Sequence, residues 1–356
     1  MGGYNTTIGG ERCTMAKRSS RVRFAYDFEQ PVEELDGQIE DLKRRTSGTG
    51  DEGGPADEEL AGRIRELEER RDELLRELVA NLTPYQRVKL ARHPLRPQSR
   101  DYIGLIFKDF MELHGDRRFG DDKAVIAGLA RLPLDPQNAS DGEGHRLMLI
   151  AQQKGRDSKD KVAHNFGMPN PEGYRKALAK MELAEKFHLP VVCMIDTPGA
   201  APAMEAEERG QAMAIAQNIF EMSGLSTPIV VLITGEGCSG GMLGMGVGDR
   251  FAMLENAYFS VISPEGCAAI LWRSADVADK AAEAMKVTAQ DMLELGVIDT
   301  IIEEPPGGAH RDAALTASNI AAYLARTLAE LSAVPIDRLR EERYEKYRSL
   351  GSFTSV

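Results

Sequence analysis

The sequence feature that most constrains the fold is a run of five aliphatic residues, Ile229 to Ile233, which leads directly into a glycine-rich segment. An unbroken β-branched and aliphatic run predicts a strand that is buried on both faces. Glycines stand at positions 235, 237, 240 and 241, and the small apolar residues after them indicate a closely packed helix. Glycine lets a backbone approach a ligand, and the free N–H groups at a helix start attract anions. The sequence therefore indicates a backbone site for an oxygen that gains negative charge.

Two known motifs compete for this segment. Gly235, Gly237 and Gly240 have the dinucleotide-binding spacing, and Glu255 lies about 20 residues on, where a ribose-binding acid would stand. That fingerprint normally opens the first strand–helix unit, whereas this one lies two thirds of the way along the chain. The second motif is the nucleophile elbow, a sharp strand-to-helix turn, in which Ser239 would be the nucleophile.

The elbow interpretation makes the protein a serine hydrolase, because Asp299 and His310 follow Ser239 in the order of an α/β-hydrolase triad. A third interpretation needs no side-chain nucleophile, since the amides of Gly240 and Gly241 donate to an enolate-like oxygen. A packing turn is the plain structural alternative, but four glycines in seven residues exceed what packing needs.

Composition narrows the classes of function. The chain has 356 residues, 42% hydrophobic residues and a net charge of −12. The acidic balance argues against nucleic-acid binding, and no apolar run approaches the roughly 18 residues of a membrane span. The four cysteines, at positions 13, 193, 238 and 267, form no C-x-x-C pair. No metal site is therefore predicted, and a reducing cytoplasm is the expected compartment.

The hydrophobic patterns divide the chain into four parts. We expect residues 1–27 to be a disordered extension, and residues 28–100 to be a helical hairpin (28–45 and 57–82) with an irregular connector over 83–100. Residues 101–312 alternate strands and helices and predict an α/β domain, and residues 313–356 predict charged C-terminal helices. The α/β part has expected helices at 102–110, 172–188, 207–222 and between 262 and 297, and expected strands at 124–132, 147–152, 191–195, 229–233, 258–262 and 297–302.

Two further strand ends have polar or flexible turns. The turn Asp196-Thr-Pro-Gly-Ala200 follows a buried strand, and ligands often bind at this edge of an α/β sheet. Lys154 and Arg156 follow another strand, in a loop with several cations that could bind coenzyme phosphates or a carboxylate. An ordinary turn and a solvated loop are the structural alternatives.

Three isolated residues carry weaker signals. Glu265 follows a strand and is more often a cap or ion-pair partner than a base. His310, as a lone histidine, is usually structural. Lys286 stands in Glu-Ala-Met-Lys, which is similar to the lysine tetrad that carries biotin, but its alanine-rich helical surroundings differ from the exposed hairpin tip that biotin attachment needs.

Many short segments, in order from about residue 27 to residue 348, resemble the alpha subunit of the bacterial-type acetyl-CoA carboxylase carboxyltransferase. Each segment is modest alone, but the ordered set is specific. The matching segments are Phe28-Glu-Gln-Pro31, Leu90-Ala-Arg-His-Pro94, Gly115-Asp-Arg, Gln153-Lys-Gly-Arg156, Asn165-Phe-Gly-Met-Pro, Pro171-Glu-Gly-Tyr-Arg-Lys-Ala-Leu178, Asp196-Thr-Pro-Gly-Ala200, Gly235-Glu-Gly, Ser239-Gly-Gly, Val261-Ile-Ser-Pro-Glu-Gly-Cys267 and Gly307-Gly-Ala-His-Arg311.

The resemblance implies a crotonase-like α/β fold, a spiral of repeated ββα units with the helical hairpin and tail added. It implies transfer of a carboxyl group from carboxybiotin, on a carrier protein, to acetyl-CoA, which gives malonyl-CoA for fatty-acid synthesis. Gly240 and Gly241 would be the catalytic oxyanion pair for the biotin ureido oxygen. The expected contacts to cofactor or coenzyme are Gly199, Ala200, Gly237, Cys238, Ser239, Lys154 and Arg156.

The resemblance also implies partners. A beta subunit that carries a zinc ribbon would complete a heterotetramer, a biotin carboxyl carrier protein would present the biotin, and a separate biotin carboxylase would use ATP. No metal, membrane or nucleic acid is expected for this chain.

The sequence departs from the family pattern beside the expected site. Ala201 and Ala203 replace a Tyr and a Gly, Cys238 replaces a Gly, and Met242 and Gly244 replace alanines. The acyl group therefore stays open, and a carboxyltransferase for another acyl-CoA is an alternative. A subunit that only supports its partner's site is a further one.

Overall fold

A computed structural model describes residues 26–46, 55–134 and 144–351, with the side chains of residues 55–57 left out. The predicted disordered extension lies, up to residue 25, outside the described residues. None of the described helices is long and apolar enough to cross a membrane.

One mixed sheet organises the chain, in the order β1-β2-β3-β4-β5-β6-β8. The strands are β1 Lys108–Glu112, β2 Val125–Leu132, β3 His145–Gln152, β4 Val191–Thr197, β5 Ile229–Cys238, β6 Arg250–Leu254, β7 Tyr258–Ser260 and β8 Thr300–Ile302. The first three are antiparallel neighbours, and the pairs from β3 onward are parallel. Strand β5 is shared, because its first half pairs with β6 and its last residues, Glu236 to Cys238, pair with β7.

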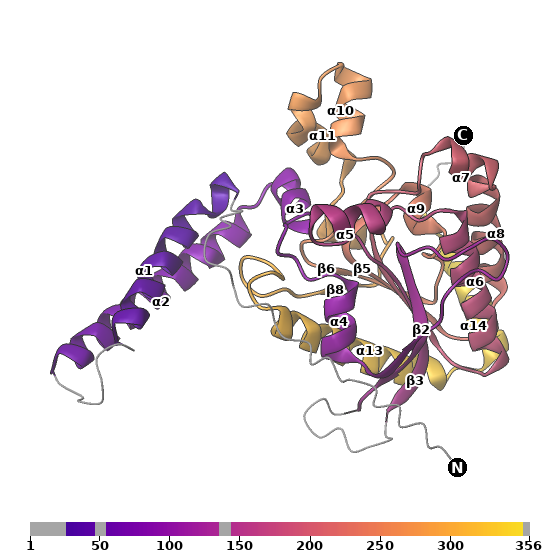
Figure 1. Cartoon of the computed structure of the whole chain (residues 1–356), viewed down its shortest axis with the longest axis horizontal. Coiled ribbons are helices and arrows are strands. Elements are labelled where there is room, and N and C mark those ends of the chain that lie inside the picture. Colours follow the sequence, from indigo (N-terminus) through magenta and orange to yellow (C-terminus); the bar gives the residue numbers. More distant parts are fainter. Residues whose placement is uncertain (1–25, 47–54, 135–143, 352–356) are drawn as a thin grey trace, which may run out of the picture.

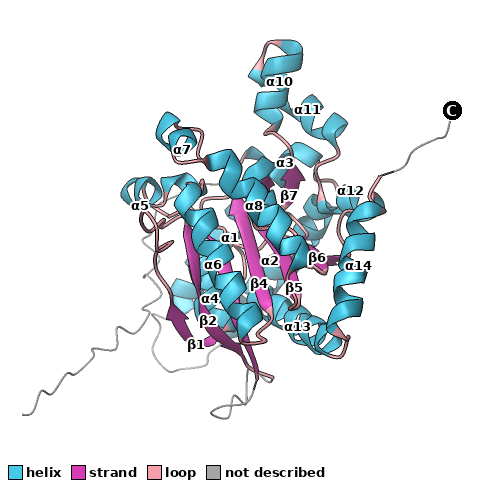
Figure 2. Cartoon of the chain, turned by 90° about the vertical axis from the view of Figure 1, so that its right-hand side faces the viewer, coloured by secondary structure: helices cyan, strands magenta, loops and turns pink. Residues whose placement is uncertain are grey.

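Helices cover the sheet and extend from it. They are α1 Gln30–Thr46, α2 Pro55–Ala80, α3 Pro84–Ala91, α4 Ser99–Ile106, α5 Ser158–Ala163, α6 Pro171–Lys186, α7 Met204–Glu208, α8 Gln211–Gly224, α9 Ser239–Leu243, α10 Pro264–Trp272, α11 Ala278–Met285, α12 Ala289–Glu294, α13 Ala313–Ser332 and α14 Ile336–Arg348. Helices α6 and α8 cover one face of the sheet and α4 and α13 the other, while the α1–α2 hairpin and the α10–α11 pair project from the body (Figures 1 and 2).

The core lies in the central parallel strands. Every residue of β4 and of β5 is buried, so the continuous apolar runs of the sequence are strands covered on both faces. The α/β class, the N-terminal hairpin and the C-terminal helices are confirmed.

The structure differs from these expectations in several elements. The expected helix over 207–222 is divided at Gly210 into α7 and α8, and the helix expected between 262 and 297 is divided into α10, α11 and α12. Residues 84–91 of the predicted connector form α3, whose start has a capping box between Thr83 and Gln86 with Pro84 at the first position. The predicted helix over 102–110 ends at Ile106, and Phe110 lies in β1 instead, because this segment pairs with β2 at the sheet edge. Strand β6 was not predicted; its five residues show no alternation because the sheet buries four of them.

Candidate functional site

The glycines of the central segment serve two different purposes. Gly235 and Gly237 lie inside β5, where a Cβ at Gly235 would stand 2.4 Å from Oδ1 of Asp196 and a Cβ at Gly237 would stand 2.5 Å from Cδ1 of Ile233. These glycines make room for neighbouring side chains and do not form a phosphate-binding turn. The dinucleotide interpretation is therefore wrong, since its glycines must follow the strand. Glu255 instead accepts a hydrogen bond from the amide of Glu304.

Gly240 and Gly241 lie in the first turn of α9, directly after the strand. The first N–H groups of a helix have no acceptor within it, and Cys238 at the N-cap makes no side-chain capping bond. Ser239 is exposed and Gly240 is partly exposed. The first turn of α9 is therefore open to solvent at Ser239 and Gly240, whereas Gly241 is buried.

Two predicted segments meet at Gly241. A Cβ at this position would lie 2.3 Å from the carbonyl carbon of Gly199 and 2.5 Å from the amide nitrogen of Ala200. Only glycine allows this approach between the α9 turn and the turn after β4. The structure thus brings Gly199 and Ala200 against the expected oxyanion pair.

Two buried side chains hold the carbonyl oxygen of Gly241. Nε2 of Gln152, at the end of β3, donates to it over 2.9 Å, and the hydroxyl of Tyr174, in α6, donates over 3.2 Å. Oε1 of Gln152 also accepts from the amide of Asp196 over 3.1 Å. Sequence reasoning missed both residues, although Tyr174 stands in a quoted family segment, because neither residue type signals such a contact by itself.

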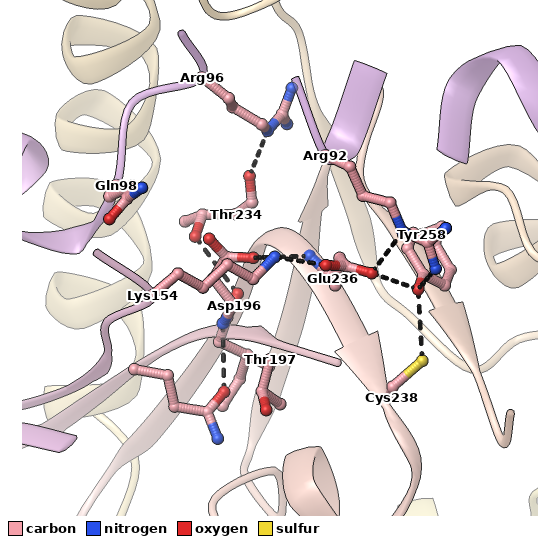
Figure 3. A network of polar contacts seen from close by, with 12 residues as sticks. Arg92, Arg96, Gln98, Lys154, Asp196, Thr197, Thr234, Glu236, Cys238 and Tyr258 are labelled. Atoms are coloured by element: carbon pink, nitrogen blue, oxygen red, sulfur yellow. Dashed lines mark hydrogen bonds and ion pairs between the residues drawn. The ribbon is translucent and has the colours of Figure 1, made fainter. Parts of the chain in front are cut away.

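A charged cluster lies beside this turn (Figure 3). Nζ of Lys154 is 2.6 Å from Oδ1 of Asp196 and 2.6 Å from Oε1 of Glu236. Glu236 also accepts from Nε of Arg92 over 2.7 Å and from the hydroxyl of Tyr258 over 2.5 Å. The cluster ties the ends of β3, β4 and β5 to α3 and β7.

The charges of this cluster stabilise one another. Burial alone would raise the pKa of Glu236, but Lys154 and Arg92 outweigh it and lower the pKa to about 2. Burial would lower the pKa of Lys154, yet Asp196 and Glu236 raise it above its ordinary value. Because the carboxylates of Asp196 and Glu236 neutralise Lys154, its positive charge stabilises the protein interior. Arg156 is exposed and pairs with Asp101.

Cys238 points away from the surface. Its thiol is 3.4 Å from the hydroxyl of Tyr258, its exposed fraction is 1%, and burial raises its pKa. The residue that departs from the family pattern therefore lies wholly in the interior, and it pairs with Ser260 of β7.

The proposed triad is not assembled, so the serine-hydrolase interpretation is wrong. The carboxylate of Asp299 accepts from the amide of Phe251 and from Nζ of Lys346. Nε2 of His310 lies 3.2 Å from Glu29, and Nδ1 of His310 has no hydrogen-bond partner among the described residues. Ser239 therefore has no base.

Glu29, His93 and His310 form a buried group whose ligand atoms lie within 4.8 Å of one another. Nδ1 of His93 accepts from the amide of Leu95, which leaves the proton on Nε2, and Nε2 lies 3.7 Å from Glu29. The two imidazole rings are stacked with centroids 3.8 Å apart. Glu29 thus pairs with His310 at 3.2 Å, while His93 lies at 3.7 Å, beyond hydrogen-bond distance. The contact anchors the N-terminal segment, and His310 is a structural histidine.

Glu265 is also structural, as expected from its position at a turn. It accepts from NH1 of Arg92 over 2.7 Å and from the hydroxyl of Tyr85 over 3.0 Å.

Comparison with known proteins decides the family. The family model for acetyl co-enzyme A carboxylase carboxyltransferase-like proteins matches residues 25–351. The chain belongs to this family. The membership confirms the resemblance found in the sequence and the enzyme class, a carboxyltransferase.

Two curated relatives have the same name, acetyl-coenzyme A carboxylase carboxyl transferase subunit alpha. The protein from Methylococcus capsulatus is 52% identical over 92% of this chain and 97% of its own length. The protein from Rhodopirellula baltica is 49% identical over 92% of this chain and 97% of its own length.

Solved structures share the fold. In a hetero-tetramer of Pseudomonas malonate decarboxylase in complex with coenzyme A, one chain matches with a TM-score of 0.51 and 18% identity, over 65% of this chain and 89% of that one. The crotonase-like fold class is thereby confirmed.

Proposed function

We propose that this carboxyltransferase-family chain acts as the alpha subunit of an acetyl-CoA carboxylase and supplies one half of a shared active site. The observation that carries the proposal is the first turn of α9, where the amides of Gly240 and Gly241 follow a buried strand and face no helical acceptor. Gly199 and Ala200 lie against this turn, and the excluded triad leaves the backbone as the donor.

In the proposed reaction a carboxyl group passes from the biotin nitrogen to the methyl carbon of acetyl-CoA, and the methyl proton passes to that nitrogen. Gly240 and Gly241 donate to the ureido oxygen of biotin, where negative charge develops. Preorganised donors of this kind are each worth about 10²- to 10³-fold in kcat. The chain needs no side-chain base for this task.

The remaining parts of the proposal concern ligands and partners. Arg156 is an exposed cation of the Lys154 loop and is the proposed contact for a coenzyme phosphate. The proposed partners are a beta subunit with a zinc ribbon, a biotin carboxyl carrier protein and a biotin carboxylase that uses ATP. The proposed compartment is the cytoplasm, and the product is malonyl-CoA for fatty-acid synthesis.

Reconstitution tests the proposal. The purified chain is incubated with acetyl-CoA and carboxybiotinylated carrier, with and without the beta subunit, and malonyl-CoA is measured. We expect malonyl-CoA only when all components are present. Formation of malonyl-CoA by this chain without the beta subunit would overturn the shared site.

A carboxyltransferase for another acyl-CoA is the second candidate. It is favoured by Ala201, which replaces a Tyr of the family pattern, because loss of the ring opens space beside the Gly199–Ala200 turn. Competition between acetyl-CoA and propionyl-CoA in the same assay decides between the two substrates. A larger kcat/KM for propionyl-CoA would show that the larger acyl-CoA is the substrate.

A further inference from the structure

We propose that Gln152 and Tyr174 are positioning residues for the oxyanion amide of Gly241, an inference that rests on the proposed function. The starting point is the length of α9, which has five residues. A helix of this length is marginal by itself, so its first turn needs outside support to hold an amide in place.

The backbone of α9 does not supply that support at Gly241. In a regular helix the carbonyl of Gly241 would accept from the amide of Met245. Here the amide of Met245 donates to Met242 over 3.0 Å, and the amide of Gly244 donates to Gly240 over 3.0 Å. The carbonyl of Gly241 is bonded instead by the side chains of Gln152 and Tyr174.

Both side chains are themselves fixed. Gln152 and Tyr174 are each 0% exposed, and Gln152 is held from its other end by the amide of Asp196. The ring of Tyr174 packs against Gly244, where a Cβ would meet the ring at 2.6 Å. Nδ2 of Asn218 donates to the carbonyls of both Tyr174 and Gly244, over 2.9 and 2.8 Å.

These contacts fix the orientation of residue 241 from two sides. The carbonyl of Gly241 shares its peptide plane with the amide of Met242, and the carbonyl of Gly240, which accepts from the amide of Gly244 over 3.0 Å, shares its plane with the amide of Gly241. Gln152 and Tyr174 hold the first plane, and Gly244, packed against the Tyr174 ring, holds the second, so both planes that meet at Gly241 are fixed. Since oxyanion stabilisation depends on donors that are in place before the reaction, loosening this carbonyl lowers kcat more than it weakens substrate binding.

The variant Tyr174→Phe removes one hydroxyl and keeps the ring. Tyr102→Phe is the matched control, because the Tyr102 side chain is also buried and its hydroxyl has no hydrogen-bond partner within residues 26–46, 55–134 and 144–351. Both variants are assembled with the beta subunit and assayed with carboxybiotinylated carrier and acetyl-CoA. We expect Tyr174→Phe to lower kcat about tenfold, the effect of losing one hydrogen bond, with KM for acetyl-CoA unchanged, and Tyr102→Phe to leave both constants at the wild-type values.

Equal kcat values for the two variants would overturn the proposal, as would a rise in KM without a fall in kcat. Thermal unfolding and gel filtration establish that each variant folds and assembles. If Tyr174→Phe does not assemble, Gln152→Met is judged by the same criterion of lowered kcat at constant KM. Failure of the proposed function is distinguishable, because the wild-type complex would then form no malonyl-CoA.

Discussion

The substitution Gly241→Ala tests the contact on which the site depends. The Cβ of the alanine would stand 2.3 Å from the carbonyl carbon of Gly199, about 1.1 Å short of the 3.4 Å at which ordinary contact begins. The clash is with backbone, so the α9 turn and the Gly199–Ala200 turn must move apart by about that distance. A misplacement of about 1 Å near a reacting group costs about 100-fold in rate, or about 2.7 kcal/mol of transition-state stabilisation.

The assay is malonyl-CoA formation by the complete complex. The matched control is Gly62→Ala, in α2, where an added Cβ meets nothing within 4 Å. We expect kcat to fall about 100-fold in Gly241→Ala and to stay at the wild-type value in Gly62→Ala. If Gly241→Ala folds, assembles and turns over like the control, the amide is not a catalytic donor and the chain only supports its partner's site.

Three further predictions concern stability and reactivity. Arg343→Met leaves Asp249 buried without its two ion-pair bonds of 2.8 and 2.9 Å, so urea denaturation should show a loss of about 3 to 5 kcal/mol in the free energy of unfolding. The control is Arg338→Met at an exposed position, and equal stabilities of the two variants would contradict this prediction. Because the pKa of Glu236 is about 2 in the folded state, below its ordinary 4.5, its contribution is complete above pH 4.5 and is lost as the pH falls toward 2. Glu236→Gln should therefore flatten the fall in unfolding free energy between pH 4.5 and 3, and an unchanged slope would refute the shift. Burial raises the pKa of Cys193 to about 12, so iodoacetamide at pH 8 should label the partly exposed Cys267 but not Cys193 until the protein unfolds. Labelling of Cys193 in the native protein, detected by mass spectrometry, would contradict this prediction.

Some expectations failed where local patterns compete with tertiary contacts. Ser239, Asp299 and His310 have the right order for a triad, yet Asp299 bonds Lys346 and His310 bonds Glu29. Order along a chain does not fix distance in space. The same holds for Lys154. Its place in a polar loop predicts a cation that is available to a ligand, but the fold brings Asp196 and Glu236 beside it.

The sequence by itself determined the long buried strands, the helical hairpin and the glycine turn, but not β6. Continuous aliphatic runs have few alternatives to a strand covered on both faces, and four glycines in seven residues after such a run indicate a close approach of the backbone. The ordered family segments also determined the class of enzyme before any geometry was known.

Only the tertiary structure decided what holds the turn in place. Gln152, Tyr174 and Gly241 come from three separate elements, β3, α6 and α9, and their contacts span up to 89 residues. Hydrogen bonds between such distant residues leave no periodic trace in the sequence, because each partner is a common residue type and only the packing of the sheet brings them together.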